Sequence, residues 1–79
     1  MDYESISRKL TDQILAGRAA KRLTQESMSF KLGMSVPTYR KVESKPLKCN
    51  ILTLYRVSEI LDCDLLAVFK TEINDKLSC

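Results

Sequence analysis

Residues 23–44 read LTQESMSFKLGMSVPTYRKVES, and this stretch decides the fold. Thr24 precedes a short run of helix-forming residues and is a natural N-cap, because its hydroxyl can accept a hydrogen bond from the first helical turn. Gly33 ends that run as the expected left-handed residue. Ser35 caps the next run, in which Pro37 falls in the first turn, where a missing N–H is tolerated. The stretch therefore predicts two short helices joined by a tight turn, which is a helix-turn-helix.

Apolar periodicity predicts a long helix before this stretch and two helices after it. The first should run from about Tyr3 to Lys21, with Gly17 at a place where another helix crosses closely. Asn50 and Asp64 are the expected N-caps of the last two helices. The inward positions recur at helical spacing: Ile6, Leu10 and Ile14 in the first helix; Ile51, Leu54, Val57 or Ser58, and Leu61 in the fourth; Leu65, Val68 and Phe69 in the fifth.

No stretch alternates with the period of a β-strand. The predicted fold class is all-α, a compact five-helix domain with its helix-turn-helix at the second and third helices. We expect residues 1–79 to form a single domain with its core between residues 6 and 69. Residues 70–79 would be a tail or an extension of the fifth helix.

Composition limits the classes of function. The 79 residues are 44% hydrophobic and 29% charged, which is typical of a soluble globular protein. No run approaches the roughly 18–20 apolar residues of a membrane span, and the N-terminus has no apolar signal segment, so a cytoplasmic location is expected. The absence of histidine, of a nucleophile–base arrangement and of a glycine-rich phosphate loop argues against an enzyme.

The three cysteines do not predict a metal site. Cys49, Cys63 and Cys79 are widely spaced, form no C-x-x-C pair, and have no histidine to complete a zinc site. We expect reduced thiols, no bound metal and no cofactor.

Charge is concentrated in the middle of the chain. Residues 18–56 carry nine basic and two acidic side chains, a net charge of +7, whereas the two ends are weakly acidic. One positive face for a polyanionic partner would explain this distribution, and so would an ordinary lysine-rich solvated surface. In the second helix of the pair, Tyr39 and Val42 can both face the core. The spacing then places four residues on the opposite, outer face: Val36, Pro37, Arg40 and Lys41.

A basic outer face on the second helix of a helix-turn-helix is typical of DNA readers, because the major groove is wide enough for one helix. Short helices joined by a glycine turn also occur in small bundles that bind no DNA. Both interpretations fit residues 23–44 taken alone.

The chain resembles the lambda-repressor/Cro-like (XRE-type) helix-turn-helix family. The resemblance runs without gaps from about Leu10 to Phe69, and it is carried by the segments LTQES, KLGMS, TYRKVES and NILTLYRVSEILDCDL. It implies a sequence-specific DNA-binding transcriptional regulator, a homodimeric repressor that inserts the helix at about 36–43 into the major groove. The implied partner is double-stranded DNA with a palindromic operator.

The resemblance also implies roles for individual residues. Val36, Pro37 and Lys41 occupy base-contacting positions, with Arg40 beside them. Arg18 and Glu43 match a basic–acidic pair that ties the first helix to the end of the third. The implied phosphate-contacting residues are Gln25, Ser44, Lys45 and Lys48.

This sequence departs from the family pattern at two kinds of position. Val36 and Pro37 cannot hydrogen-bond through their side chains, although they could contact a thymine methyl group while Lys41 or Arg40 reads guanine. Tyr39 replaces the usual inward aliphatic residue, and its hydroxyl needs a partner or an outlet to solvent.

The alternative function is a protein-binding module, with an antitoxin that represses its own operon as the concrete case. Apolar residues occupy four positions that the family leaves polar, and they would either extend the core or form a partner surface: Leu15, Phe30, Leu52 and Leu66. The apolar run at 65–69 exceeds what one helix face can bury, so Leu66 and Phe69 are the expected homodimer contacts.

Overall fold

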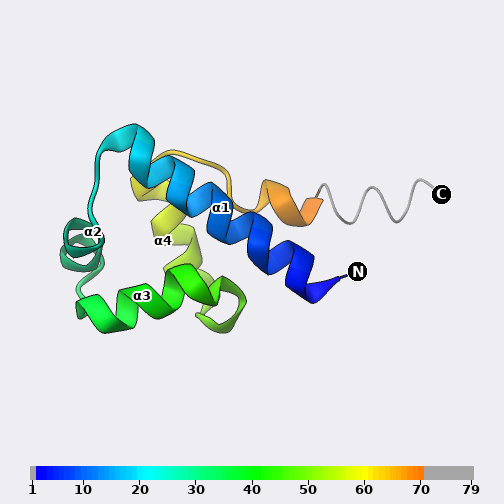
Figure 1. The fold of residues 1–79 in the computed structure, drawn as a ribbon, viewed down its shortest axis with the longest axis horizontal. Helices are drawn as coiled ribbons and strands as arrows, with labels where there is room; N and C mark the ends of the chain where they lie inside the picture. The colour runs from blue at the N-terminus through cyan, green and yellow to red at the C-terminus, as the bar shows by residue number, and fades with distance from the viewer. Residues whose placement is uncertain (1, 71–79) are drawn as a thin grey trace.

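The computed structural model describes residues 2–70, and within this range the regular structure is entirely helical (Figure 1). The elements are α1 (Tyr3–Lys21), α2 (Gln25–Leu32), α3 (Val36–Ser44), the short 3-10 helix η1 (Pro46–Lys48) and α4 (Ile51–Leu61). Helical backbone resumes at residues 67–70, where the fifth helix was predicted. The all-α prediction is confirmed. No helix in this part of the chain is both long and apolar enough to cross a membrane.

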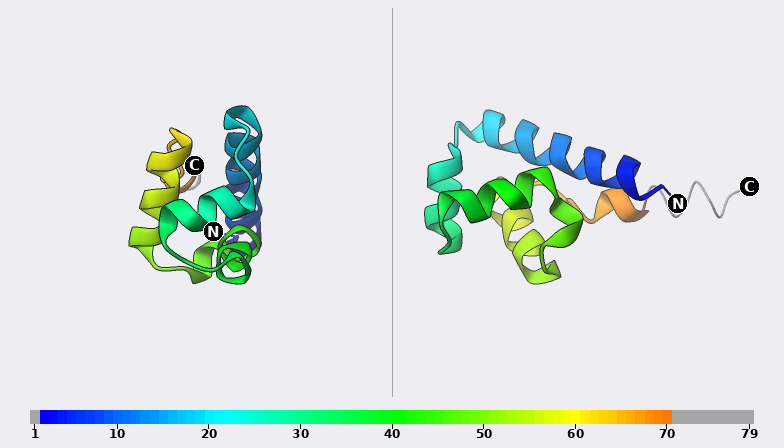
Figure 2. Two further views of the ribbon diagram at one scale, coloured as in Figure 1. Left: turned by 90° about the vertical axis from the view of Figure 1, so that its left-hand side faces the viewer. Right: turned by 60° about the horizontal axis from the view of Figure 1, so that its bottom comes forward.

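α2 lies beyond the C-terminal end of α1. From the end of α2, α3 runs back beneath α1 (Figures 1 and 2). The predicted caps form this turn region. Thr24 Oγ1 accepts from the backbone N–H of Ser27 at 3.0 Å, and Ser35 Oγ accepts from that of Thr38 at 3.3 Å. Gly33 takes the left-handed conformation, with a φ of 70°. These local interactions fix the angle at which α3 leaves α2.

Two helices end in a left-handed residue that is not glycine. Arg22 ends α1 with a φ of 55°, and Asp62 ends α4 with a φ of 52°. At the first of these ends, the N–H of Leu23 donates to the carbonyl of Arg18 at 2.9 Å, while the Leu23 side chain packs against the core. The packing of Leu23 after the end of α1 therefore stabilises the left-handed conformation of Arg22, although this residue is not glycine.

The core joins all the helices. Its buried hydrophobic members are Ile6, Leu10, Ile14, Met28, Leu32, Tyr39, Val42, Leu54, Val57, Leu61, Leu65 and Val68. The inward positions predicted for α1 are confirmed, and so are Leu65 and Val68. The prediction for Ile51 is wrong, because this side chain is 66% exposed. It lies roughly a quarter turn from the centre of the buried stripe of α4, which consists of Leu54, Val57 and Leu61.

The predicted close crossing at Gly17 is also present. A Cβ atom added at Gly17 would lie 3.2 Å from both Cβ and Cδ1 of Leu61. Glycine therefore lets α1 approach α4 at this point, and this contact holds the end of α4 behind the helix-turn-helix.

Candidate nucleic-acid interface

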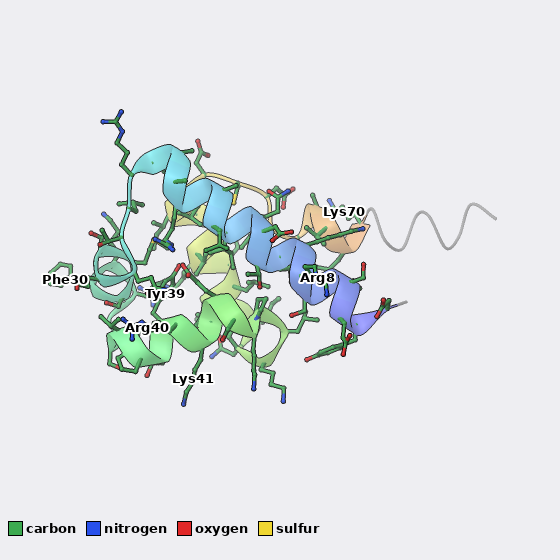
Figure 3. The ribbon with its side chains drawn as sticks, viewed as in Figure 1. Arg8, Phe30, Tyr39, Arg40, Lys41 and Lys70 are labelled. Atoms are coloured by element: carbon green, nitrogen blue, oxygen red, sulfur yellow. The ribbon has the colours of Figure 1, made fainter. Side chains whose placement is uncertain are left out.

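The outer face of α3 is exposed and basic. Pro37, Arg40 and Lys41 are exposed, whereas Val36 is only half-exposed. Lys41 points away from the body of the molecule (Figure 3). Tyr39 and Val42 lie on the opposite side of the same helix and are buried. The helical spacing thus predicted the orientation of α3, although it overstated the exposure of Val36.

Three lysines gather on one side of α3. Lys41, Lys45 and Lys48 line a hollow of about 570 Å³ between α3 and η1, together with Thr38, Val42, Ser44 and Cys49. The structure therefore brings one predicted base-contacting residue beside three predicted phosphate-contacting ones. Thr38 was missed by the sequence analysis. It is exposed and one helical turn before Lys41, and its spacing could have indicated this position.

A second hollow lies at the N-terminal end of α2, on the other side of α3. Its volume is about 360 Å³, and it is lined by Arg18, Arg22, Leu23, Thr24, Gln25, Glu26, Val36 and Arg40. Val36 and Arg40 therefore face α2, while Lys41 faces the lysine hollow. Arg22 was not predicted as a member of the site. It comes close to α2 because α1 ends at this residue in the left-handed conformation.

A chain of hydrogen bonds links α1 to the outer face of α3. Arg18 Nε donates to Glu43 Oε2 at 2.6 Å, and Arg18 Nη2 reaches Glu43 Oε1 at 3.4 Å. Gln25 Nε2 donates to Glu43 Oε1 at 2.9 Å, and Arg40 Nε donates to Gln25 Oε1 at 3.1 Å. The Glu43 side chain is only 6% exposed. A buried carboxylate thus holds α1, α2 and α3 together.

Comparison with known proteins agrees with this geometry. A family model described as helix-turn-helix matches residues 14–68. The chain belongs to the XRE-type helix-turn-helix family. It is 38% identical over 60 residues to an uncharacterized HTH-type transcriptional regulator, YqaE, from Bacillus subtilis (strain 168). That match covers 76% of this chain and 52% of the relative, so the chain spans about half of the relative's length. No solved structure gives a significant match.

One buried group of this helix-turn-helix domain is poorly satisfied. The Tyr39 side chain is fully buried, and its hydroxyl makes no hydrogen bond of normal geometry among the described residues. Burial raises the pKa of the Tyr39 phenol, and the nearby Glu43 carboxylate raises it further. We expected a partner or a solvent outlet for this hydroxyl; the Glu43 carboxylate lies near it, but no hydrogen bond of normal geometry joins the two.

The predicted dimer and partner residues of the domain differ in exposure. Leu66 is 36% exposed and shares a hollow with Tyr55, whereas Phe69 is half-buried and packs against the core. Phe30 on α2 is 88% exposed and points outward (Figure 3). Leu15 and Leu52 are also exposed. The apolar residues at the four positions that the family leaves polar thus lie mainly outside the core.

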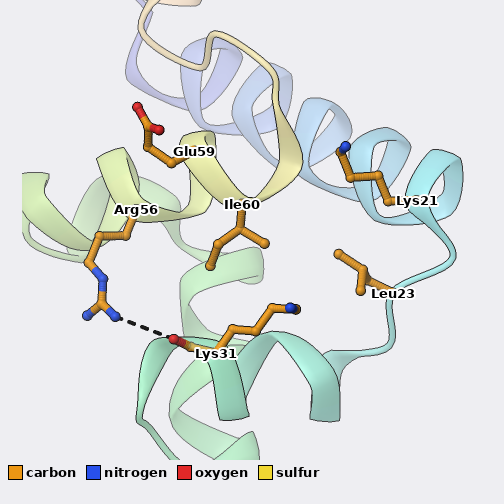
Figure 4. A pocket seen from close by; sticks show the side chains of 6 residues that line it. All are labelled: Lys21, Leu23, Lys31, Arg56, Glu59 and Ile60. Atoms are coloured by element: carbon orange, nitrogen blue, oxygen red, sulfur yellow. Dashed lines mark hydrogen bonds between the residues drawn. The ribbon is translucent and has the colours of Figure 1, made fainter.

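A third hollow, larger than the two beside α3, contains no residue of α3. It measures about 650 Å³ and is lined by Lys21, Leu23, Lys31, Arg56, Glu59 and Ile60 (Figure 4). Arg56 donates to the backbone carbonyl of Lys31 at 3.4 Å and to that of Leu32 at 3.5 Å. These bonds join α4 to the C-terminal end of α2, so Arg56 helps to hold the helix-turn-helix against α4.

The two described cysteines are free thiols. Burial raises the pKa of Cys49 and of Cys63, which keeps both thiols protonated. The predictions for Cys79 and for the tail after Lys70 lie outside the described residues. Within residues 2–70, no group of three or more His, Cys, Asp or Glu side chains is placed to hold a metal ion.

Proposed function

We propose that this chain is a sequence-specific DNA-binding transcriptional regulator that inserts α3 into the major groove. The observation that carries the proposal is the placement of Lys41, Lys45 and Lys48 along one side of α3 and η1. An exposed helix with a flanking row of cations suits a duplex, because the helix can enter the groove while the flanking cations meet phosphates. The name of the Bacillus relative, a transcriptional regulator, supports the same function.

The proposed roles follow from the side of α3 on which each residue lies. Lys41 reads a guanine edge, and Pro37 with the half-exposed Val36 contacts thymine methyl groups. Ser44, Lys45 and Lys48 hold the duplex backbone on one side of α3. Gln25 holds it on the other side, at the N-terminus of α2, where the helix dipole favours an anion.

We further propose that the regulator acts as a homodimeric repressor. Support comes from the exposed Leu66 beside Tyr55, an apolar contact that lies on the acidic side of the chain with Glu59, Asp62 and Asp64. This acidic end would be repelled by DNA and is therefore free to meet a second copy. Two copies related by a two-fold axis would bind half-sites about one helical turn apart.

Selection of bound sequences from a random pool of duplexes tests this function. We expect enrichment of a palindromic motif, and weaker binding to a scrambled duplex of the same length. Equal affinity for selected and scrambled duplexes would contradict sequence-specific recognition. A motif without two-fold symmetry would contradict the dimer but leave the DNA-binding proposal intact.

A second candidate is a module that binds a protein partner and represses its own operon, as antitoxins do. Phe30 favours it, because an aromatic side chain that is 88% exposed contributes nothing to the core. Purification of the chain together with the product of a neighbouring gene tests this candidate. Loss of that complex in Phe30→Ser would assign the surface, and retention would exclude Phe30 from it.

A further inference from the structure

We propose that Gln25 is a positioning residue for Arg40, and that it thereby sets the base preference that Arg40 confers. The inference rests on the proposed DNA-binding function and adds a role to Gln25 beyond contact with a phosphate. It starts from the bond between Gln25 Oε1 and Arg40 Nε, which spans 15 residues of the sequence.

The position of Gln25 is fixed by contacts that do not involve Arg40. Gln25 is the first residue of α2, whose N-cap Thr24 holds the backbone at this point. Its amide nitrogen donates to Glu43, which is buried and is already held by Arg18. The hydroxyl of Thr11 also donates to the backbone carbonyl of Glu43 at 2.6 Å. The acceptor for Gln25 therefore stays in place whatever Arg40 does.

An amide fits between these two charges because it carries both a donor and an acceptor. Its nitrogen faces the Glu43 carboxylate, and its oxygen faces the Arg40 guanidinium. Turning the amide over would bring oxygen against carboxylate and N–H against guanidinium, and both contacts would be repulsive. A carboxylate at position 25 would be repelled by Glu43, and a cation would be repelled by Arg40. The orientation of Gln25 Oε1 is thus set by its surroundings.

The bond limits what Arg40 can present to DNA. Because Nε is engaged, the guanidinium offers its two terminal nitrogens, which can contact guanine O6 and N7 as a pair. The bond also draws Arg40 toward the hollow beside α2 and away from Lys41. An arginine that is held before DNA arrives loses less side-chain freedom on binding. Arg40 and Lys41 therefore read separate base pairs.

The experiment is a double-mutant cycle on the selected duplex and on its single-base-pair variants. Gln25→Met keeps the length of the side chain but removes both hydrogen-bonding ends. Arg40→Ala should lower the ratio of selected to scrambled affinity by about 5- to 150-fold, the usual range for a lost two-pronged base contact. Gln25→Met should relax preference at the same base pair, and the double variant should show the same preference there as Arg40→Ala, although it also loses the backbone contact of Gln25. Lys48→Ala is the control that weakens all duplexes alike.

The outcomes separate the two proposals. A wild-type chain that does not discriminate between duplexes overturns the proposed function itself. If the wild type discriminates but Gln25→Met weakens every duplex equally, Gln25 contacts only the backbone and the inference fails. If Gln25→Met unfolds below the assay temperature, Arg40→Lys is measured in its place. Lysine keeps the positive charge of arginine but has no Nε atom for Gln25 to hold. Arg40→Lys should relax the same base pair, and an unchanged preference would overturn the inference.

Discussion

Arg18 and Glu43 lie 25 residues apart in the sequence and meet in an ion pair that joins α1 to α3. The pair is more than a link between two helices, because Glu43 also accepts from Gln25 at the start of α2. A single carboxylate in the third helix therefore orders the two helices that precede it.

Glu43→Ala should destabilise the domain by about 3–5 kcal/mol, because it leaves Arg18 with a poorly exposed and unpaired charge. Small domains have only about 5–15 kcal/mol of stability in total, so this variant should unfold near room temperature. Thermal melting followed by circular dichroism measures the effect. Glu59→Ala removes an exposed carboxylate and should change stability by less than about 0.5 kcal/mol. Equal melting of the two variants would show that the pair is unimportant in solution.

Gly17→Ala should lower the free energy of unfolding by about 1 kcal/mol. Alanine gains about 1 kcal/mol in helix propensity over glycine, but its Cβ would crowd Leu61, whose Cβ cannot rotate away. Denaturant titration gives the change. Ala16→Gly, at the neighbouring exposed position, measures the propensity difference alone. If Gly17→Ala raised the free energy of unfolding by as much as Ala16→Gly lowered it, α1 and α4 would not approach closely.

Tyr39→Phe should raise the free energy of unfolding by about 1 kcal/mol near neutral pH, because it removes a buried hydroxyl without a hydrogen-bond partner. The variant should also change the response to alkali. The folded-state pKa of Tyr39 is raised, so its contribution is complete below the unfolded pKa of about 10 and declines as pH rises above it. Wild-type stability should therefore fall more steeply than that of Tyr39→Phe above about pH 10. If the stability of the wild type and of Tyr39→Phe fell equally with rising pH, the Tyr39 hydroxyl would be in contact with solvent.

Lys41→Ala and Lys48→Ala should weaken DNA binding in different ways. Lys41 points outward from α3, so its loss should cost about 1–3 kcal/mol and lower the ratio of selected to scrambled affinity. Lys48 lies in η1, so its loss should leave that ratio nearly unchanged and reduce the salt slope by about one unit. Titrations of both duplexes at several salt concentrations test this. Identical behaviour of the two variants would mean that α3 does not enter the groove in the proposed orientation.

Leu66→Asp should dissociate the proposed homodimer, because it places a charge in the apolar contact beside Tyr55 and next to Asp62 and Asp64. Sedimentation equilibrium should show a dimer for the wild type and a monomer for the variant. Phe30→Asp is the matched control, since Phe30 is exposed on α2, and it should leave the dimer intact. A wild-type chain that is monomeric at high micromolar concentration would contradict the interface.

The parts of the fold that depend on local chemistry could be predicted from the sequence. Thr24, Ser35 and Asn50 cap the helices that follow them because each acts on a backbone N–H three residues away. The left-handed ends at Arg22 and Asp62 could not be predicted in this way. At Arg22 the conformation depends on the packing of Leu23 against the core, and no local pattern marks it.

The candidate site shows the same division. The spacing of Tyr39 and Val42 predicted which face of α3 is exposed, because one helix determines it. It could not predict that Gln25 would bond Arg40, since that contact depends on how α2 and α3 cross. The spacing of Thr38 could have placed it on the outer face beside Lys41, but neither its hollow nor that of Arg22 could be predicted. Each becomes part of a hollow only once a second element, η1 or α2, is packed beside it.

The burial of Glu43 has a consequence for genetics. A screen for cells that lose regulation by this chain should recover two kinds of allele. Changes at Lys41 would abolish recognition at every growth temperature while the protein still accumulates. Changes at Glu43 or Arg18 would give temperature-sensitive alleles with reduced protein levels, since unfolded chains are degraded. Recovery of regulation at low growth temperature would then distinguish the residues that hold the fold together from those that contact the operator.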